Sequence, residues 1–146
     1  MRNLLLALPI LALCTGVAQA NNQRTLFKTT RASEQTDAVA AFMAMVTLAE
    51  QGFAPAMDRV GYYHRHGVGT QKNLHKAHHW YARAVAGGHR WSTASLARVE
   101  FDLGLAFAAY HRLKIAIRDG KLGVNRLYAT AHIDGKFGPS SNPETG

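Results

Sequence analysis

Histidine is the residue type whose spacing in this chain most suggests chemistry. Six of the eight histidines fall within 26 residues: His64, His66, His75, His78, His79 and His89. His75 and His79 are four residues apart, so on a helix they share a face, and this spacing allows two imidazoles to hold zinc, nickel or copper. A metal site needs a third ligand, and the segment lacks the His-Glu-x2-His arrangement of helical metalloproteases. One hypothesis is therefore a small periplasmic metal-binding protein or enzyme that uses the His64–His89 cluster, with His75 and His79 as metal candidates.

The alternative is that these histidines are polar residues on solvated helix faces, where they gain positive charge as the pH falls through about 6.5.

Other catalytic patterns are absent from the sequence. It has no serine nucleophile elbow and no phosphate-binding glycine loop after a strand, and its nine acidic residues are scattered. We therefore expect no enzyme activity and no cofactor.

Helical periodicity, interrupted by glycine turns, dominates the chain between residues 36 and 120. Thr36 or Asp37 can cap the first helix and Asn73 the third, whereas Gly67 and Gly69 permit the positive φ that ends a helix and reverses the chain. Gly104 is expected to divide the last helical stretch, which Ser92 can cap. The expected helices cover residues 38–51, 55–66, 74–86 and 92–119.

The helices also repeat. A shift of 36 residues places Asp37 on Asn73 and Gly52 on Gly88, so the first helix matches the third. A period of this length is typical of stacked helix pairs, each of which buries its apolar face against its neighbours.

One unit of this repeat resembles the Sel-1-like repeat family, a tetratricopeptide-like group of helical hairpins. The Gly-x-Gly turn, the Lys-Ala-x2-Trp-Tyr segment and the closing Gly-His all have the family's spacing. His64 and Thr70 depart from it, because the family usually has tyrosine and valine there. The best unit spans residues 54–89, preceded by what reads as only the second helix of a repeat. Its repeat-defining residues are Ala56, Gly61, Gly67, Gly69, Asn73, Lys76, Ala77, Trp80, Tyr81, Ala84, Gly88 and His89.

The resemblance implies an all-α fold, a short right-handed α-solenoid of antiparallel helix-turn-helix repeats. It also implies a non-catalytic protein–protein interaction adaptor. If the core takes Ala56, Val60 and His64, the opposite side of that helix is the predicted partner-binding face. This face comprises Arg59, Tyr62, Tyr63 and His66. The competing interpretation is that the tyrosines cover neighbouring helices.

The first 20 residues are typical of a signal peptide. Arg2 precedes an apolar run from Leu4 to Leu13, and Ala18-Gln19-Ala20 is a small-x-small cleavage site. Leu13 before Cys14 argues against a lipoprotein, because lipoprotein signals place a small residue there. We expect a periplasmic or secreted chain with a flexible lead-in over 21–35, a repeat domain over 36–120 and an irregular, largely disordered tail over 121–146.

The charge balance predicts the kind of partner. Lys and Arg number 17 against nine acidic residues, a formal net charge of +8, of which the signal carries one. This balance favours a protein partner with an acidic face, whereas export argues against nucleic acid and the apolar run is too short for a membrane anchor. The first helix has an apolar face at the end of the stack, so dimerisation or docking through Phe42 and Met45 is a further hypothesis.

Overall fold

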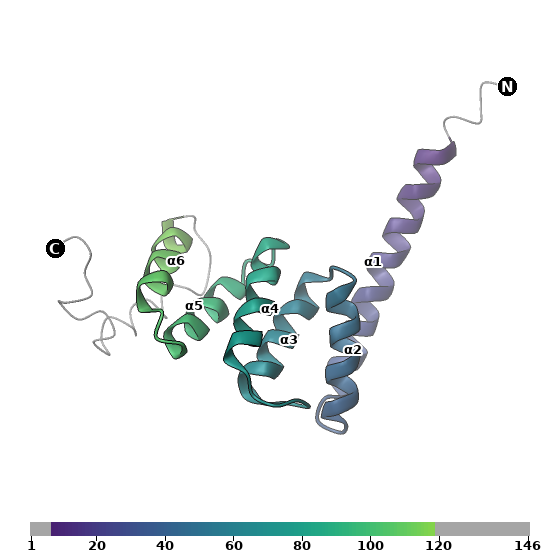
Figure 1. Ribbon diagram of the computed structural model, residues 1–146. Helices are drawn as coiled ribbons and strands as arrows, with labels where there is room; N and C mark the ends of the chain where they lie inside the picture. The colour runs from purple at the N-terminus through teal and green to yellow at the C-terminus, as the bar shows by residue number, and fades with distance from the viewer. Residues whose placement is uncertain (1–6, 119–146) are drawn as a thin grey trace.

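Residues 7–118 of the computed structural model form six helices and no strand, and side chains are described from residue 17 onward. The helices succeed one another along a stack, with α1 at one end and α6 at the other (Figure 1). The main contacts join consecutive helices, as expected for an all-α helical-repeat solenoid. The helices are α1 (Ala7–Ser33), α2 (Ala38–Glu50), α3 (Ala54–His66), α4 (Leu74–Ala86), α5 (Ser92–Asp102) and α6 (Ala106–Arg118).

The predicted caps and turns position α2, α3 and α4. The Asp37 carboxylate accepts a hydrogen bond from the Ala40 amide, and the Asn73 side chain accepts one from the Lys76 amide, both at 2.9 Å. Gly67 ends α3 with φ of 76°, as predicted. Gly69 has φ of 64°, and a Cβ atom there would lie 2.0 Å from the Ala38 carbonyl oxygen. The loop between α3 and α4 therefore packs directly on the start of α2.

The flexible lead-in predicted for residues 21–35 is wrong, because α1 continues through this segment to Ser33. Phe27 of α1 contacts Phe53 edge-on, with ring centroids 5.6 Å apart. Glu34, just after α1, forms an ion pair with Arg59 of α3. A polar segment with little periodicity thus becomes helical by packing on the stack, and it supplies the first helix of the pair that α2 completes.

The core lies between the helix pairs. Tyr63 and Val60 of α3 pack with Met45 and Leu48 of α2, and Tyr81 of α4 packs with Leu96 of α5. Small repeat-defining residues allow this close contact between helices. Three of them have no exposed surface: Ala56, Ala77 and Ala84. Tyr81 is buried in this core, while Trp80 lies half-buried at its edge.

The last helical stretch is two helices, as Gly104 predicted. Gly104 has φ of 78° between α5 and α6. The predicted cap is wrong, because Trp91 occupies the N-cap position of α5 without a side-chain hydrogen bond. The hydroxyl of Ser92 donates instead to Asp58 of α3.

The predicted tail over 121–146 and the side chain of Cys14 lie outside the described residues. The predicted cleavage site after Ala20 falls within α1. None of the helices in residues 7–118 combines the length and the apolar character that a membrane span requires.

Candidate functional site

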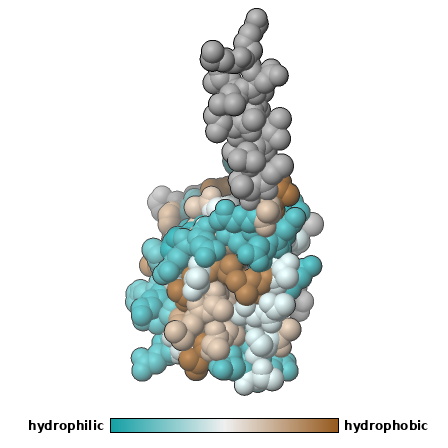
Figure 2. All heavy atoms as spheres, turned by 90° about the vertical axis from the view of Figure 1, so that its right-hand side faces the viewer, coloured by the Kyte–Doolittle hydropathy of each residue, from teal (hydrophilic) through white to brown (hydrophobic). Residues whose placement is uncertain are grey.

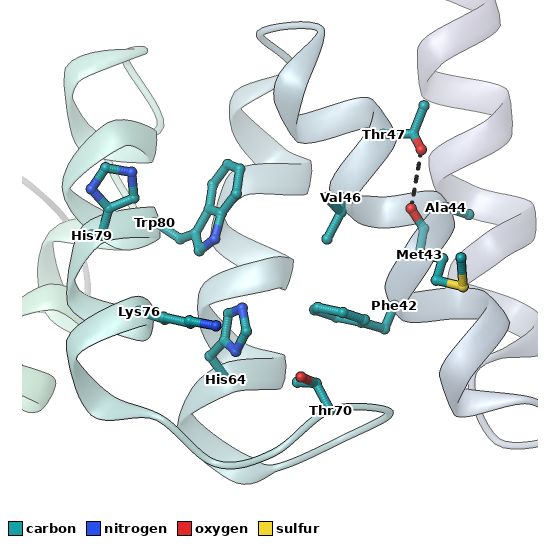
Figure 3. A pocket seen from close by; sticks show the side chains of 10 residues that line it. All are labelled: Phe42, Met43, Ala44, Val46, Thr47, His64, Thr70, Lys76, His79 and Trp80. Atoms are coloured by element: carbon teal, nitrogen blue, oxygen red, sulfur yellow. Dashed lines mark hydrogen bonds between the residues drawn. The ribbon is translucent and has the colours of Figure 1, made fainter.

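A groove between α2 and α4, with α3 and the 67–73 loop at its base, is the strongest candidate for a binding site (Figure 3). Its volume is about 740 Å³. We call it the α2–α4 groove. Its lining residues are Phe42, Met43, Ala44, Val46, Thr47, His64, Thr70, Lys76, His79 and Trp80.

Aromatic and aliphatic side chains form two sides of this groove. Phe42 and Val46 come from α2, and the indole of Trp80 faces them from α4 (Figure 3). The guanidinium of Arg83 lies 4.5 Å from the centroid of the Trp80 ring, a cation–π contact that holds the indole in place. The groove therefore offers a fixed apolar surface to an incoming side chain.

His64 and Lys76 add polar groups to the base of the groove. His64 is only 6% exposed and packs edge-on against Phe42, with ring centroids 5.3 Å apart. Burial, with the nearby charge of Lys76, lowers the pKa of His64, although a hydrogen bond to the Gln71 backbone acts in the opposite direction. The ionisable residues of the lining are His64, Lys76 and His79, so the groove has basic groups and no acidic one.

The predicted partner-binding face on α3 is largely committed to the fold. Tyr63 has no exposed surface, so its assignment to an exposed binding face is wrong. Arg59 is paired with Glu34 and lies over the rings of Tyr62 and Tyr63. Tyr63 and the half-buried Tyr62 instead pack against neighbouring helices, as the competing interpretation of the sequence expected.

His66 keeps an exposed position, stacked on Tyr62 with ring centroids 4.4 Å apart. It lines a separate cavity of about 410 Å³ together with Arg65, Lys72, Leu74 and Asp102. Arg65 and Asp102 are already paired with each other there, at 2.8 Å. The predicted face therefore offers a smaller and more polar surface than the α2–α4 groove.

The fold separates the six clustered histidines. His64 lies at the base of the groove and His66 in the second cavity, whereas His75 and His79 are exposed on α4. His78 turns toward α5, with its Nε2 atom 3.4 Å from a carboxylate oxygen of Glu100. Among the described side chains, which are those of residues 17–118, no three His, Cys, Asp or Glu residues are close enough to hold a metal ion. The third ligand that the His75–His79 hypothesis requires is therefore missing from this part of the chain.

Ser92, His89 and Asp58 form a hydrogen-bonded constellation that superficially resembles a hydrolase triad. The Ser92 hydroxyl donates to Oδ1 of Asp58 at 2.6 Å and lies 2.8 Å from Nδ1 of His89. In a triad the histidine lies between the serine and the acid, so that it can remove the serine proton. Here the serine lies in the middle and is fully buried. The arrangement joins α3 to α5 and to the turn before it, which is a structural role for these three residues.

Glu100 of α5 is a buried carboxylate that joins three helices. Its side chain is 2% exposed and accepts hydrogen bonds from Nε and Nη2 of Arg112 on α6, the shortest of them 2.7 Å. His78 of α4 approaches from the other side. A buried carboxylate with a bidentate guanidinium partner is a structural ion pair that connects α5 to α6.

The end of the stack also differs from the prediction. Met45 has no exposed surface and belongs to the core, so its proposed role in docking is wrong, while Phe42 lines the groove. The exposed apolar residues of α2 are Val39 and Met43, at 58% and 64% exposure. Figure 2 views this end of the molecule and shows hydrophobic atoms bordered by hydrophilic ones. Val39 and Met43 are exposed because α1 leaves this side of α2 uncovered.

Comparison with known proteins identifies the repeat. The family model of the Sel1 repeat matches residues 54–89, which are α3, α4 and the turns that follow them. The structure of a Sel1 repeat protein from Oxalobacter formigenes superposes with a TM-score of 0.65 at 24% sequence identity, over 78% of this chain and 51% of that one. This chain thus spans about half the length of that neighbour, and no curated protein matches it. Residues 54–89 therefore match a Sel1 repeat, and the chain around them has a fold similar to that of the Sel1 repeat protein from Oxalobacter formigenes.

Proposed function

We propose that this chain is an exported, non-catalytic adaptor that holds a segment of a protein partner in the α2–α4 groove. Sel1 repeats mediate protein–protein interaction, which gives the general class of function. The observation that supports this site is the groove itself: a preformed space of about 740 Å³ with an apolar wall at Trp80. Repeat proteins bind through such surfaces because stacking positions side chains from successive helices along one face.

The charge of the groove supports a partner with an acidic face. Lys76 and His79 are exposed on α4 beside Trp80, and none of the ten lining residues is acidic. The chain as a whole has a formal net charge of +8, so its field attracts an acidic surface before contact. The place of this interaction is the periplasm or the extracellular space, on the strength of the N-terminal signal pattern.

Photo-crosslinking in cells tests the proposal. A photoreactive amino acid at Met43, which is exposed at the groove, should form an adduct with a discrete partner. The matched control carries the same residue at Arg98, an exposed position of α5 that is absent from the lining of the groove. Mass spectrometry then identifies the adduct. Equal adducts from positions 43 and 98, or none at 43, would contradict a partner site in the groove.

A second copy of the chain is the other partner that the structure favours. Val39 and Met43 expose apolar surface on α2, next to the first helix of the stack, and repeat proteins cover the apolar surface of their terminal units with a polar cap or a partner. Sedimentation velocity of wild type and of the variant Val39→Glu measures this directly. A wild-type dimer that dissociates in the variant supports self-association. A wild-type monomer at about 100 μM, where even a weak dimer should form, would exclude it.

A further inference from the structure

One residue that lines the α2–α4 groove has a buried polar atom without a partner. Three buried side-chain polar atoms among the described residues have no hydrogen-bond partner: Tyr63 Oη, His64 Nδ1 and Thr93 Oγ1. Of these three residues, only His64 lines the groove. Buried polar groups in folded proteins are almost always paired, so a ligand is one explanation for such a group in a cavity wall.

The second observation is the ammonium group of Lys76. Figure 3 shows the Lys76 side chain extending toward the imidazole of His64. No ion pair joins Lys76 to any residue of the described part of the chain. A cation beside an imidazole, without an acidic neighbour, favours a negatively charged ligand that both groups can contact.

The groups around His64 are otherwise neutral. Helix α2 contributes the Phe42 ring, the loop contributes Thr70 and the backbone of Gln71, and α4 contributes Lys76. The apolar wall formed by Phe42, Val46 and Trp80 lies next to this pair of basic groups (Figure 3). The ligand should therefore present a negative charge next to an apolar group.

We propose that the α2–α4 groove binds a peptide segment of the partner in which an aspartate or glutamate is adjacent to an apolar residue. The carboxylate lies between His64 Nδ1 and the Lys76 ammonium, and the apolar side chain packs against Trp80 and Phe42. This inference rests on the proposed function and adds the chemistry of the bound segment. In the tautomer that carries its hydrogen on Nδ1, His64 donates this hydrogen to the carboxylate, so binding of the acid satisfies the unpaired atom.

Matched peptides test this proposal on the purified, exported protein. The probes are fluorescent hexapeptides with blocked ends, each containing leucine or phenylalanine beside an aspartate. Each has a twin in which asparagine replaces the aspartate, and a third peptide has asparagine with a free C-terminal carboxylate. Fluorescence anisotropy should show at least about tenfold tighter binding of the aspartate peptide than of its asparagine twin, since hydrogen bonds to charged groups contribute this much.

Two lysine variants supply the matched controls. Lys76→Gln should weaken the aspartate peptide about tenfold and leave the asparagine twin unchanged. Lys72→Gln removes the same charge from the loop, outside the groove lining, and should change affinity less than twofold. In NMR titrations the pKa of His64 should rise when the aspartate peptide is bound and stay unchanged with the asparagine twin.

The alternative outcomes separate the two proposals. Equal affinity for aspartate and asparagine peptides, equal effects of the two lysine variants, or no binding by any peptide would overturn the acidic-segment inference. Preference for the free C-terminal carboxylate would overturn the choice of a side-chain acid. A crosslink at position 43 in cells, together with any of these results, would leave the adaptor function standing and remove only the proposed ligand chemistry.

Discussion

A Cβ atom built on Gly61 would lie 2.9 Å from Cδ1 and Cε1 of Tyr81. The absent side chain at Gly61 therefore sets how closely α3 can approach α4, and the buried Tyr81 ring fills the space that remains. This contact fixes the spacing within the Sel1 repeat, and with it the position of Trp80, the residue before Tyr81 on α4. The width of the α2–α4 groove thus depends on a glycine that lies outside it.

Gly61→Ala should lower the free energy of unfolding by about 1–2 kcal/mol, because overpacking outweighs the better helix propensity of alanine. Urea denaturation measures this change. The control is the same substitution in a Tyr81→Ala background, where the collision is gone and alanine at position 61 should cost nothing. An equal cost in both backgrounds would show that the Tyr81 ring does not limit the approach.

Ser92→Ala should destabilise the fold by about 1–2 kcal/mol, because Asp58 and His89 both lose their hydrogen-bond partner. Ser33→Ala, which removes only a local bond to the Thr30 carbonyl at the end of α1, should cost less than about 0.5 kcal/mol. Thermal and urea unfolding compare the two variants. A Ser92→Ala variant as stable as wild type would refute the structural role of the hydrogen bonds among Ser92, His89 and Asp58.

Arg112→Ala should be far more destabilising than Arg65→Ala, although each removes an arginine paired to a carboxylate. Glu100 is 1% exposed, so loss of Arg112 leaves a buried charge without its main partner, at a cost of about 3 kcal/mol. Asp102 is exposed, and loss of Arg65 should cost less than about 1 kcal/mol. Adding Glu100→Gln to Arg112→Ala should recover part of the loss in chemical denaturation. Similar costs for the two arginine variants would argue against burial as the deciding factor.

The stability of the chain should fall as the pH drops below about 6.5, the ordinary histidine pKa. Burial, the largest effect, lowers the pKa of His64 in the folded state, so below pH 6.5 the unfolded chain binds a proton more readily than the folded one. Burial also lowers the pKa of His66, which acts in the same direction. Urea unfolding at pH 7.5 and 5.5 should show a smaller loss in His64→Gln than in wild type. The control is His75→Gln, which removes an exposed histidine and should lose as much stability as wild type. If His64→Gln also loses as much stability as wild type between pH 7.5 and 5.5, His64 does not cause the pH dependence.

Helix positions followed from the sequence because short-range interactions determine them. Asp37 and Asn73 cap their helices as predicted, and Gly67, Gly69 and Gly104 take the positive φ expected of turn glycines. The main error was to expect a flexible segment where α1 continues to Ser33, because the polar residues of this segment show no helical periodicity. Its helix is stabilised by contacts such as Phe27 with Phe53, which no local pattern reveals.

The binding site was harder to predict because it depends on how three helices pack. Phe42 and Trp80 are 38 positions apart in the sequence and face the same groove only after α3 packs between their helices. Tyr63 was assigned to the wrong side, because helical spacing within α3 cannot show that Phe42 and Met45 of α2 pack against it. The sequence shows that position 64 is histidine where the family usually has tyrosine. Only the structure shows that the Nδ1 atom of His64 is unpaired and that Lys76 lines the same groove.

Tryptophan quenching measures occupancy of the groove most directly. The chain has two tryptophans, and in Trp91→Phe only Trp80, in the groove, remains fluorescent. Saturation with the partner captured by crosslinking should lower the acrylamide quenching constant of Trp80 several-fold, because the partner covers the indole. In Trp80→Phe, the exposed Trp91 should be quenched equally with and without the partner. An unprotected Trp80 in the saturated complex would contradict the account, since the partner would then bind elsewhere on the chain.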